Sequence, residues 1–215
     1  MDPWRLAHDT ARAAGVDLRP LDGVDDARLV NDVIHAIWGD EVPMPREVVR
    51  ALASSGNVPW GAFDGTRIVG FVLGWAGVDD DGLHVHSHQL ATLPDRRRSG
   101  VGVALKFAQR AQALAQDIHV ARWTFDPMIA RNAAFNLRRL GAIADRFHRS
   151  FYGEMTDEQN RGERSDRLVV RWDLDREPGA RVSDQRAPRL PVPPDRDELR
   201  ARDPEAARRA RDGLA

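Results

Sequence analysis

A turn rich in arginine and glycine, between a predicted strand and a predicted helix, has the residues needed to bind phosphate. It lies within Leu90 to Gly102, whose sequence is LATLPDRRRSGVG. Gly100 and Gly102 allow close approach of the backbone, and the free N–H groups at the start of the next helix carry the positive end of its dipole. We expect a diphosphate here, with the arginines at 96–98 binding a further phosphate of the same ligand. The spacing fits neither a Walker loop nor a dinucleotide fingerprint.

Three histidines alternate along the strand predicted at Leu83 to Leu93. The period of two places His84, His86 and His88 on one face together with Leu90. A neutral imidazole accepts a proton near pH 7, so this face offers a general base. His88 is the first candidate, His86 the second and His84 the third. The alternative is that these histidines only fill a half-buried strand face.

The same histidine spacing occurs in zinc enzymes, which makes a metal hydrolase a separate hypothesis. Such an enzyme needs further ligands or an acid that activates water. The aspartate expected soon after such a histidine run in metallo-β-lactamase-like enzymes is absent from this sequence. We therefore expect no metal site.

Patterns of apolar residues predict the elements that position these groups. Strands are expected at 16–21, 58–63, 67–78, 83–93, 119–125, 142–151 and 167–174, and helices at 25–38, 46–53, 101–115 and 130–140. Strands alternate with helices after a middle region rich in hairpins. This order predicts an α/β (α+β) fold with a mixed, mostly antiparallel sheet of six to seven strands and helices on both faces.

Composition and charge exclude several classes of protein. The 215 residues contain no cysteine, which removes disulfide frameworks, thiolate zinc sites and cysteine nucleophiles. A formal net charge of -1 gives no overall field that would attract nucleic acid, and no apolar run is long enough to span a membrane. Because the first residues also lack the pattern of a secretory signal, we expect a cytoplasmic protein.

The last part of the sequence differs from the rest. Residues 176–215 contain 6 of the 13 prolines and almost no large apolar side chains. The run from Arg189 to Pro194 favours polyproline II geometry, and Asp203-Pro204-Glu205 predicts the capped first turn of a final helix. We expect one domain over residues 1–175, followed by a proline-rich arm and helix over 176–215. The arm and helix would either pack on that domain or remain mobile.

The segment Arg97-Arg98-Ser99-Gly100-Val101-Gly102 resembles the acyl-coenzyme A loop of the GNAT N-acyltransferase superfamily, Arg/Gln-x-x-Gly-x-Gly/Ala. The predicted order of elements over residues 16–174 is similar to that of the superfamily. A narrower resemblance, to a little-characterised branch of predicted acetyltransferases, rests on further blocks. They include Ser87-His88, Leu105-Lys106, Trp123-Thr-Phe-Asp-Pro127, Asn132-Ala133, Tyr152-Gly153 and Ser165-Asp166-Arg167-Leu168.

This resemblance implies that acyl-coenzyme A is the co-substrate and that an amine attacks its thioester directly in a ternary complex. It implies a sheet that splays beside the acyl-coenzyme A site, with the pantetheine arm along Leu90, Ala91 and Thr92. The residues implied to hold the diphosphate are Arg97, Arg98, Ser99, Gly100, Val101 and Gly102. Asn132, at the start of the next helix, falls near the family's side-chain contact to coenzyme A.

Catalysis in this family needs a base for the amine and an acid for the departing thiolate. His88, just before the pantetheine strand, is the expected base. Many GNAT enzymes use a tyrosine of the penultimate helix as the acid, but alignment on Gly141 places Leu137 there. Tyr152, the only tyrosine in the sequence, is therefore the expected acid. An ordinary structural tyrosine is the alternative.

The acceptor amine has no signature in the sequence. The default is acetyl transfer to a small molecule or amino acid. A larger acyl group such as succinyl is an alternative, for which Arg161, Arg164 and Arg167 offer partners for a carboxylate. A catalytically idle module that binds acyl-coenzyme A is another, and a homodimer is left open. Asp126 is expected to cap the turn before Pro127 rather than to hold substrate or a histidine.

Overall fold

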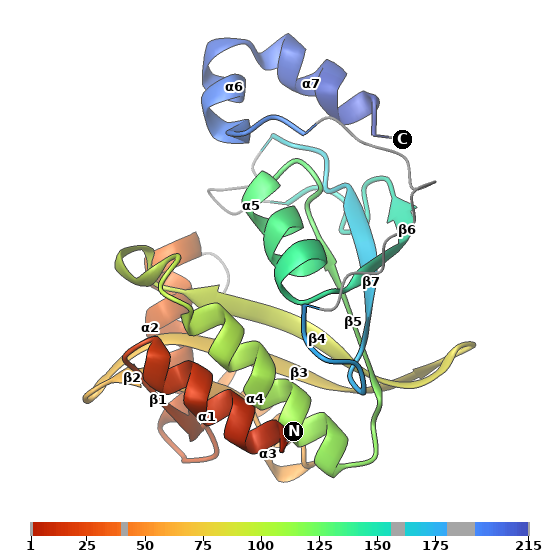
Figure 1. Ribbon diagram of the computed structural model, residues 1–215. Coiled ribbons are helices and arrows are strands. Elements are labelled where there is room, and N and C mark those ends of the chain that lie inside the picture. Colours follow the sequence, from red (N-terminus) through yellow and green to blue (C-terminus); the bar gives the residue numbers. More distant parts are fainter. Residues whose placement is uncertain (1, 40–42, 156–161, 180–191, 215) are drawn as a thin grey trace. The chain divides into compact units, whose positions relative to one another are not determined.

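The computed structural model describes residues 2–39, 43–155, 162–179 and 192–214 (Figure 1). They form two compact units, the first over residues 2–121 and the second over residues 122–155 and 162–214. Arg161 and the first residues of the predicted polyproline II run lie outside the described residues. No helix within the described ranges is both long enough and apolar enough to cross a membrane.

Four antiparallel strands form the sheet of the first unit. They are β1 (Asp17–Pro20), β2 (Trp60–Asp64), β3 (Arg67–Asp79) and β4 (Gly82–Thr92), hydrogen-bonded in that order. The hairpin between β2 and β3 turns at Gly65, whose φ of 57° is in the left-handed region that glycine adopts without strain. Long central strands of apolar residues, such as Phe71 and Leu73, make the middle of this sheet fully buried.

Helices cover both faces of this four-stranded sheet. The helices of this unit are α1 (Pro3–Ala13), α2 (Asp26–Trp38), α3 (Arg46–Ser54) and α4 (Val101–Ala115), with a short 3-10 turn η1 (Pro94–Arg96) before α4. Figure 1 shows α1 and α4 side by side on one face and α2 on the other, where it contacts β3 and β4. Small residues such as Ala7, Ala11 and Ala104 let α1 lie close to α4, so α4 is buried on nearly all sides.

The second unit combines three strands with short helices. After the start of β5 (Val120–Phe125), it contains α5 (Ala130–Ala133), the π-helical segment η2 (Ala134–Arg139), β6 (Ile143–His148), β7 (Arg167–Asp173), α6 (Arg196–Arg202) and α7 (Pro204–Asp212). β7 is hydrogen-bonded between β5 and β6, and it is antiparallel to β6. Figure 1 shows α6 and α7 as a packed pair of helices.

The predicted α/β (α+β) class is confirmed, with seven mostly antiparallel strands and helices among the described residues. The predicted strands and the predicted helices 25–38, 46–53 and 101–115 all form, within one to three residues at their ends. The helix predicted at 130–140 forms as α5 followed by the π-helical η2. The helices α1 and α6 were not predicted from the sequence. The expected splay and the boundary near residue 175 stay predictions.

Candidate functional site

The glycine-containing turn presents a row of backbone donors at the start of α4. Arg98 has a φ of 65° and Gly100 a φ of 97°, so two left-handed residues turn the chain just before the helix. The backbone N–H groups of residues 98–102 have no acceptor among the described residues. Because they belong to the turn and to the first residues of a 15-residue helix, the helix dipole adds to their attraction for an anion.

Only part of the arginine triplet is available to a phosphate. The Arg96 guanidinium pairs with the Asp64 carboxylate at the β2–β3 hairpin. Arg97 and Arg98 are exposed and form no ion pair within the described ranges. The Ser99 hydroxyl donates to the Arg96 carbonyl at 2.7 Å, which closes the turn. A phosphate would therefore meet the free amides first and the two exposed arginines second.

A β-bulge at His88 changes the predicted arrangement of β4. Ser87 pairs with Gly74 and Gln89 pairs with Leu73, which are adjacent on β3. His88, between them on β4, is therefore an extra residue without a partner of its own on β3. Leu90 pairs with Val72, which shares a face with Gly74. Leu90 therefore lies on the face of Ser87, and its predicted place beside the histidines is wrong. The strict alternation assumed from the sequence ends at the bulge.

The indole of Trp75, on β3, organises the histidine face. Its ring centroid lies 5.0 Å from that of His86 and 4.9 Å from that of His88. Burial lowers the pKa of His88, and burial together with the neighbouring cationic groups lowers the pKa of His86 to about 4. Both imidazoles are therefore neutral near pH 7, the form that accepts a proton. His84 is buried, and its Nδ1 lies 3.1 Å from the Gly82 carbonyl oxygen, so it is the least accessible of the three.

On the opposite face of β4, a buried lysine contacts the residue beside the bulge. Lys106 of α4 donates from Nζ to Ser87 Oγ at 2.6 Å and to Gln109 Oε1 at 3.4 Å. Complete burial lowers the pKa of Lys106 to about 7. The sequence block Leu105-Lys106 was used for the resemblance, but its link to Ser87 was not predicted. It joins the helix of the phosphate turn to the strand that carries His88.

Tyr152 and Asn132 belong to the second unit, whereas His88 and the phosphate turn belong to the first. The Tyr152 hydroxyl lies 3.1 Å from the Thr124 hydroxyl, and its backbone N–H donates to Ser165 Oγ at 3.0 Å. The Tyr152 side chain is exposed, which suits a group that meets substrate. Asn132 lies in the first turn of α5, and its half-buried side chain has no hydrogen bond to a described residue.

Asp126 caps a turn as predicted, and it also holds the last two helices. Its Oδ1 accepts the Met128 N–H at 2.9 Å. Its Oδ2 pairs with the guanidinium groups of Arg196 on α6, at 2.7 Å, and Arg211 on α7, at 3.2 Å. All three side chains are almost completely buried. The helices of the C-terminal segment are thus fixed to the second unit by buried ion pairs.

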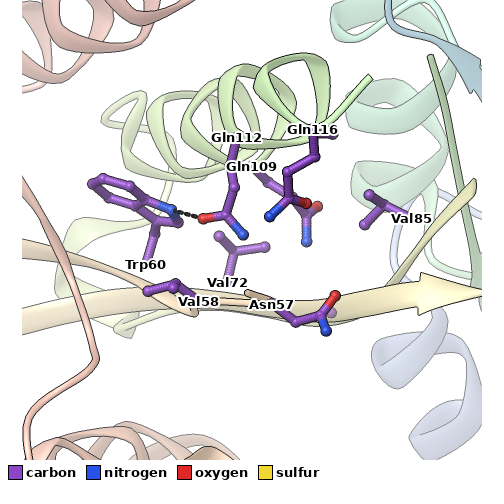
Figure 2. Close-up of a pocket in the computed structure, with 10 residues that line it drawn as sticks. Asn57, Val58, Trp60, Val72, Val85, Gln109, Gln112 and Gln116 are labelled. Carbon is purple, nitrogen blue, oxygen red and sulfur yellow. Dashed lines mark hydrogen bonds between the residues drawn. The ribbon is translucent and has the colours of Figure 1, made fainter. Parts of the chain in front are cut away.

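A small cavity in the first unit lies between α4 and the strands β2 to β4 (Figure 2). Gln109 and Gln112 of α4 and Gln116 just after it point into the cavity, and Trp60 Nε1 donates to Gln112 Oε1 at 2.6 Å. With about 10 Å³ of free space it has room for about one water molecule. It is a polar packing site beneath the helix and lies apart from the phosphate turn. Among the residues described, no three His, Asp or Glu side chains are grouped to hold a metal ion.

A family model and several solved structures indicate the same family of proteins. The model of the acetyltransferase (GNAT) family matches residues 30–141. The fold is similar to the ribosomal-protein-S18-alanine N-acetyltransferase from Escherichia coli, with a TM-score of 0.58 and 13% identity over 81% of this chain and 99% of that one. Chaetomium thermophilum Naa20 in complex with a bisubstrate analogue is also similar, with a TM-score of 0.59 and 19% identity over 74% of this chain and 86% of that one. An acetyltransferase of the GNAT family from Streptococcus pneumoniae has a TM-score of 0.58 and 16% identity over 73% of this chain and 98% of that one. No curated protein gives a significant match in sequence.

Proposed function

Because the chain belongs to the acetyltransferase (GNAT) family and is an N-acyltransferase with acyl-coenzyme A as its co-substrate, we propose that it acetylates the amine of a small molecule or amino acid. The amine attacks the thioester carbon of acetyl-coenzyme A directly in a ternary complex. A C–N bond forms, the C–S bond breaks, and the proton of the amine leaves to a base. Since the sequence contains no cysteine, no acyl-cysteine intermediate is available. The absence of cysteine and of a long apolar run supports our placement of this reaction in the cytoplasm.

The row of free amides in residues 98–102 is the observation that supports the proposal most. It offers a diphosphate several N–H donors at once, with Arg97 and Arg98 beside them for a further phosphate. The pantetheine arm would then follow Leu90, Ala91 and Thr92, whose strand leads directly into this turn. Asn132 is the family's expected side-chain contact to coenzyme A.

We assign the general base to His88. His88 is accessible as a residue, and its imidazole is neutral near pH 7 and packs against Trp75 at the bulge of β4. Gln89, the next residue, faces the same side because it pairs with Leu73, two residues before Trp75. Its Oε1 is buried without a donor among the described residues. An amine N–H would satisfy this oxygen, so Gln89 would hold the acceptor while His88 takes its proton.

Tyr152 is our candidate for the acid that protonates the departing thiolate. The position used by many family members is Leu137, which has no proton to give. The Tyr152 hydroxyl is exposed, and the Thr124 hydroxyl at 3.1 Å can accept or return its proton. The role rests on this chemistry and on Tyr152 being the only phenol in the sequence.

A thiol-release assay tests the proposal. The purified chain would be mixed with acetyl-coenzyme A and a panel of amines that includes amino acids, diamines and short peptides. Peptides belong in the panel because one similar solved structure is Arabidopsis thaliana Naa50 with the bisubstrate analogue CoA-Ac-MVNAL. We expect turnover with at least one amine and its loss in His88→Ala and Tyr152→Phe. Unchanged turnover in both variants would overturn the catalytic assignment, and binding of coenzyme A without any turnover would overturn acetyl transfer.

A further inference from the structure

Arg167, the first residue of β7, is a buried cation without a carboxylate partner. Its relative exposure is 7%. Nη1 donates to the Asp166 carbonyl at 2.8 Å, and Nη2 lies 3.2 Å from the Met155 sulfur, a weak acceptor. Among the described residues it forms no ion pair. This guanidinium therefore keeps N–H groups that no described residue accepts.

The acidic side chains near Arg167 are already engaged by other arginines. The Asp166 carboxylate accepts from Arg164, at 2.7 Å for the closest pair of atoms. Asp126 pairs with the arginines of α6 and α7. Glu163 pairs with Arg211 at 3.3 Å. Among the described residues of the second unit, Arg167 is thus the buried arginine without an ion pair, whereas Arg122, Arg196 and Arg211 each have one.

A buried guanidinium without a counter-ion is unfavourable because burial removes its hydration. Burial is accordingly the largest cause that lowers the pKa of Arg167, with attraction from Asp126 opposed by repulsion from Arg211 and Arg196. An anion that reaches the free N–H groups would remove this cost. A carboxylate matches the planar fork of arginine and can accept two of its N–H groups at once.

An exposed aromatic pair begins beside the buried cation. The Arg167 guanidinium carbon lies 5.3 Å from the centre of the Tyr152 ring, which is 45% exposed. Phe151 is 44% exposed and packs edge-on against Tyr152, at 4.8 Å between ring centres. An organic acid can place its hydrocarbon part on these rings while its charge meets the arginine. A bare inorganic anion would gain nothing from them.

We propose that Arg167, beside the Tyr152 ring on which Phe151 packs, binds a carboxylate of the substrate. The inference rests on the proposed N-acyl transfer for the identity of that substrate. The carboxylate belongs either to an acceptor amino acid or to the far end of a dicarboxylic acyl group such as succinyl. Of the three arginines considered from the sequence, Arg164 is taken by Asp166 and Asp212, and Arg161 lies outside the described residues.

Binding can be tested without catalysis, by calorimetry on the full chain with coenzyme A present. The probes are succinate and its uncharged isostere succinamide. We expect succinate to bind at least tenfold more tightly than succinamide, and Arg167→Met to lose this preference. Arg171→Met, on the same strand, is the matched control and keeps it. Equal affinity of the unmodified protein for both probes would overturn the proposal even if Arg167→Met failed to fold.

Steady-state kinetics then identify the source of the carboxylate. One arm compares phenylalanine with phenylalanine amide as acceptors of acetyl from acetyl-coenzyme A, and the other compares succinyl- with butyryl-coenzyme A as donors. In one arm, Arg167→Met should cut kcat/KM at least tenfold for the charged member and leave the neutral member unchanged, while Arg167→Lys recovers part of the loss. Equal effects on both members in both arms would refute the proposal. Absence of all turnover would refute N-acyl transfer instead, and the calorimetry would still decide the role of Arg167.

Discussion

The ring centroid of His88 lies 4.9 Å from that of Trp75, and His86 contacts the same indole from 5.0 Å. His88 occupies the extra position of a β-bulge, where two residues of β4 face one position of β3. The bulge turns the chain and the indole limits the rotation of the ring. The candidate base is therefore held by a backbone irregularity and by a flat apolar surface, without a carboxylate partner among the described residues.

Removal of this imidazole should affect turnover and leave binding intact. We expect His88→Ala to lower kcat by about 10²- to 10⁴-fold, the usual contribution of a general base, with an unchanged dissociation constant for acetyl-coenzyme A. His86→Ala, which loses a ring from the same indole, is the control and should cost far less. If His86→Ala had the larger effect on kcat, the base would be His86.

The pH profile should follow the environment of His88. Burial lowers its pKa below the ordinary value of 6.5, and the base acts only when it is neutral. The kcat/KM value should therefore stay constant from pH 8 downward and fall only at a pH below 6.5. A kcat/KM value that already falls between pH 8 and pH 7 as the pH is lowered would contradict this assignment.

Gly100 should control acyl-coenzyme A binding through its backbone conformation. Its φ of 97° is unfavourable for alanine, so Gly100→Ala should distort the turn and weaken acyl-coenzyme A binding about tenfold or more. Gly82→Ala introduces a similar strain at the turn between β3 and β4, where φ is 100° and an added Cβ meets no atom within 4 Å, and is the matched control. Calorimetric titration of both variants with coenzyme A makes the comparison. Equal losses of affinity would show that general destabilisation is responsible.

Lys106 should make stability depend on pH. Its pKa is about 7 in the folded chain and 10.5 when unfolded, so between these values the unfolded state binds more protons. The free energy of unfolding should therefore rise with pH across this window, by up to about 1.4 kcal/mol per pH unit. Denaturant unfolding at pH 7, 8 and 9 measures the slope, and Lys106→Met should lack this part of it. Identical slopes in the two proteins would show that the lysine is not buried in this way.

Asp126 should be essential for the stability of the second unit. Asp126→Asn leaves two buried arginines without their shared counter-ion, which should cost about 3 to 5 kcal/mol in the free energy of unfolding. Asp9→Asn, which breaks exposed ion pairs on α1, should cost less than about 1 kcal/mol. Adding Arg211→Met to Asp126→Asn should recover part of the loss. Similar values for the two single variants would contradict the burial of this network.

The elements could be predicted because they follow from local patterns. Alternation and helical spacing are properties of neighbouring residues, so strands such as β3 and the long helix α4 were within reach of the sequence. The bulge at His88 could not be predicted from the sequence, because it depends on how β4 pairs with β3. The role of Trp75 has the same origin. Helix α1 was not predicted from the sequence, and its two fully buried positions, Ala7 and Ala11, are small residues.

The candidate site shows the same division. The phosphate turn is contiguous in sequence, so it could be predicted from its glycines and arginines. The pairing of Arg96 with Asp64 could not, because the two residues are distant in sequence. From the sequence, Arg167 and Arg164 were both candidates to pair with a substrate carboxylate. Only the neighbouring ion pairs distinguish the two, because they show which arginine the chain has already neutralised.

The ion pairs of Asp126 also set an order of events during synthesis. The carboxylate is made 70 residues before Arg196 and 85 residues before Arg211, and β6 and β7 are synthesised in between. A nascent chain that has reached only β7 holds this acidic group without either partner. The strands of the second unit can pair at that stage, but the ion pairs that stabilise the unit form only after the two arginines have been synthesised. Folding of this unit is thus tied to the arrival of its last helices.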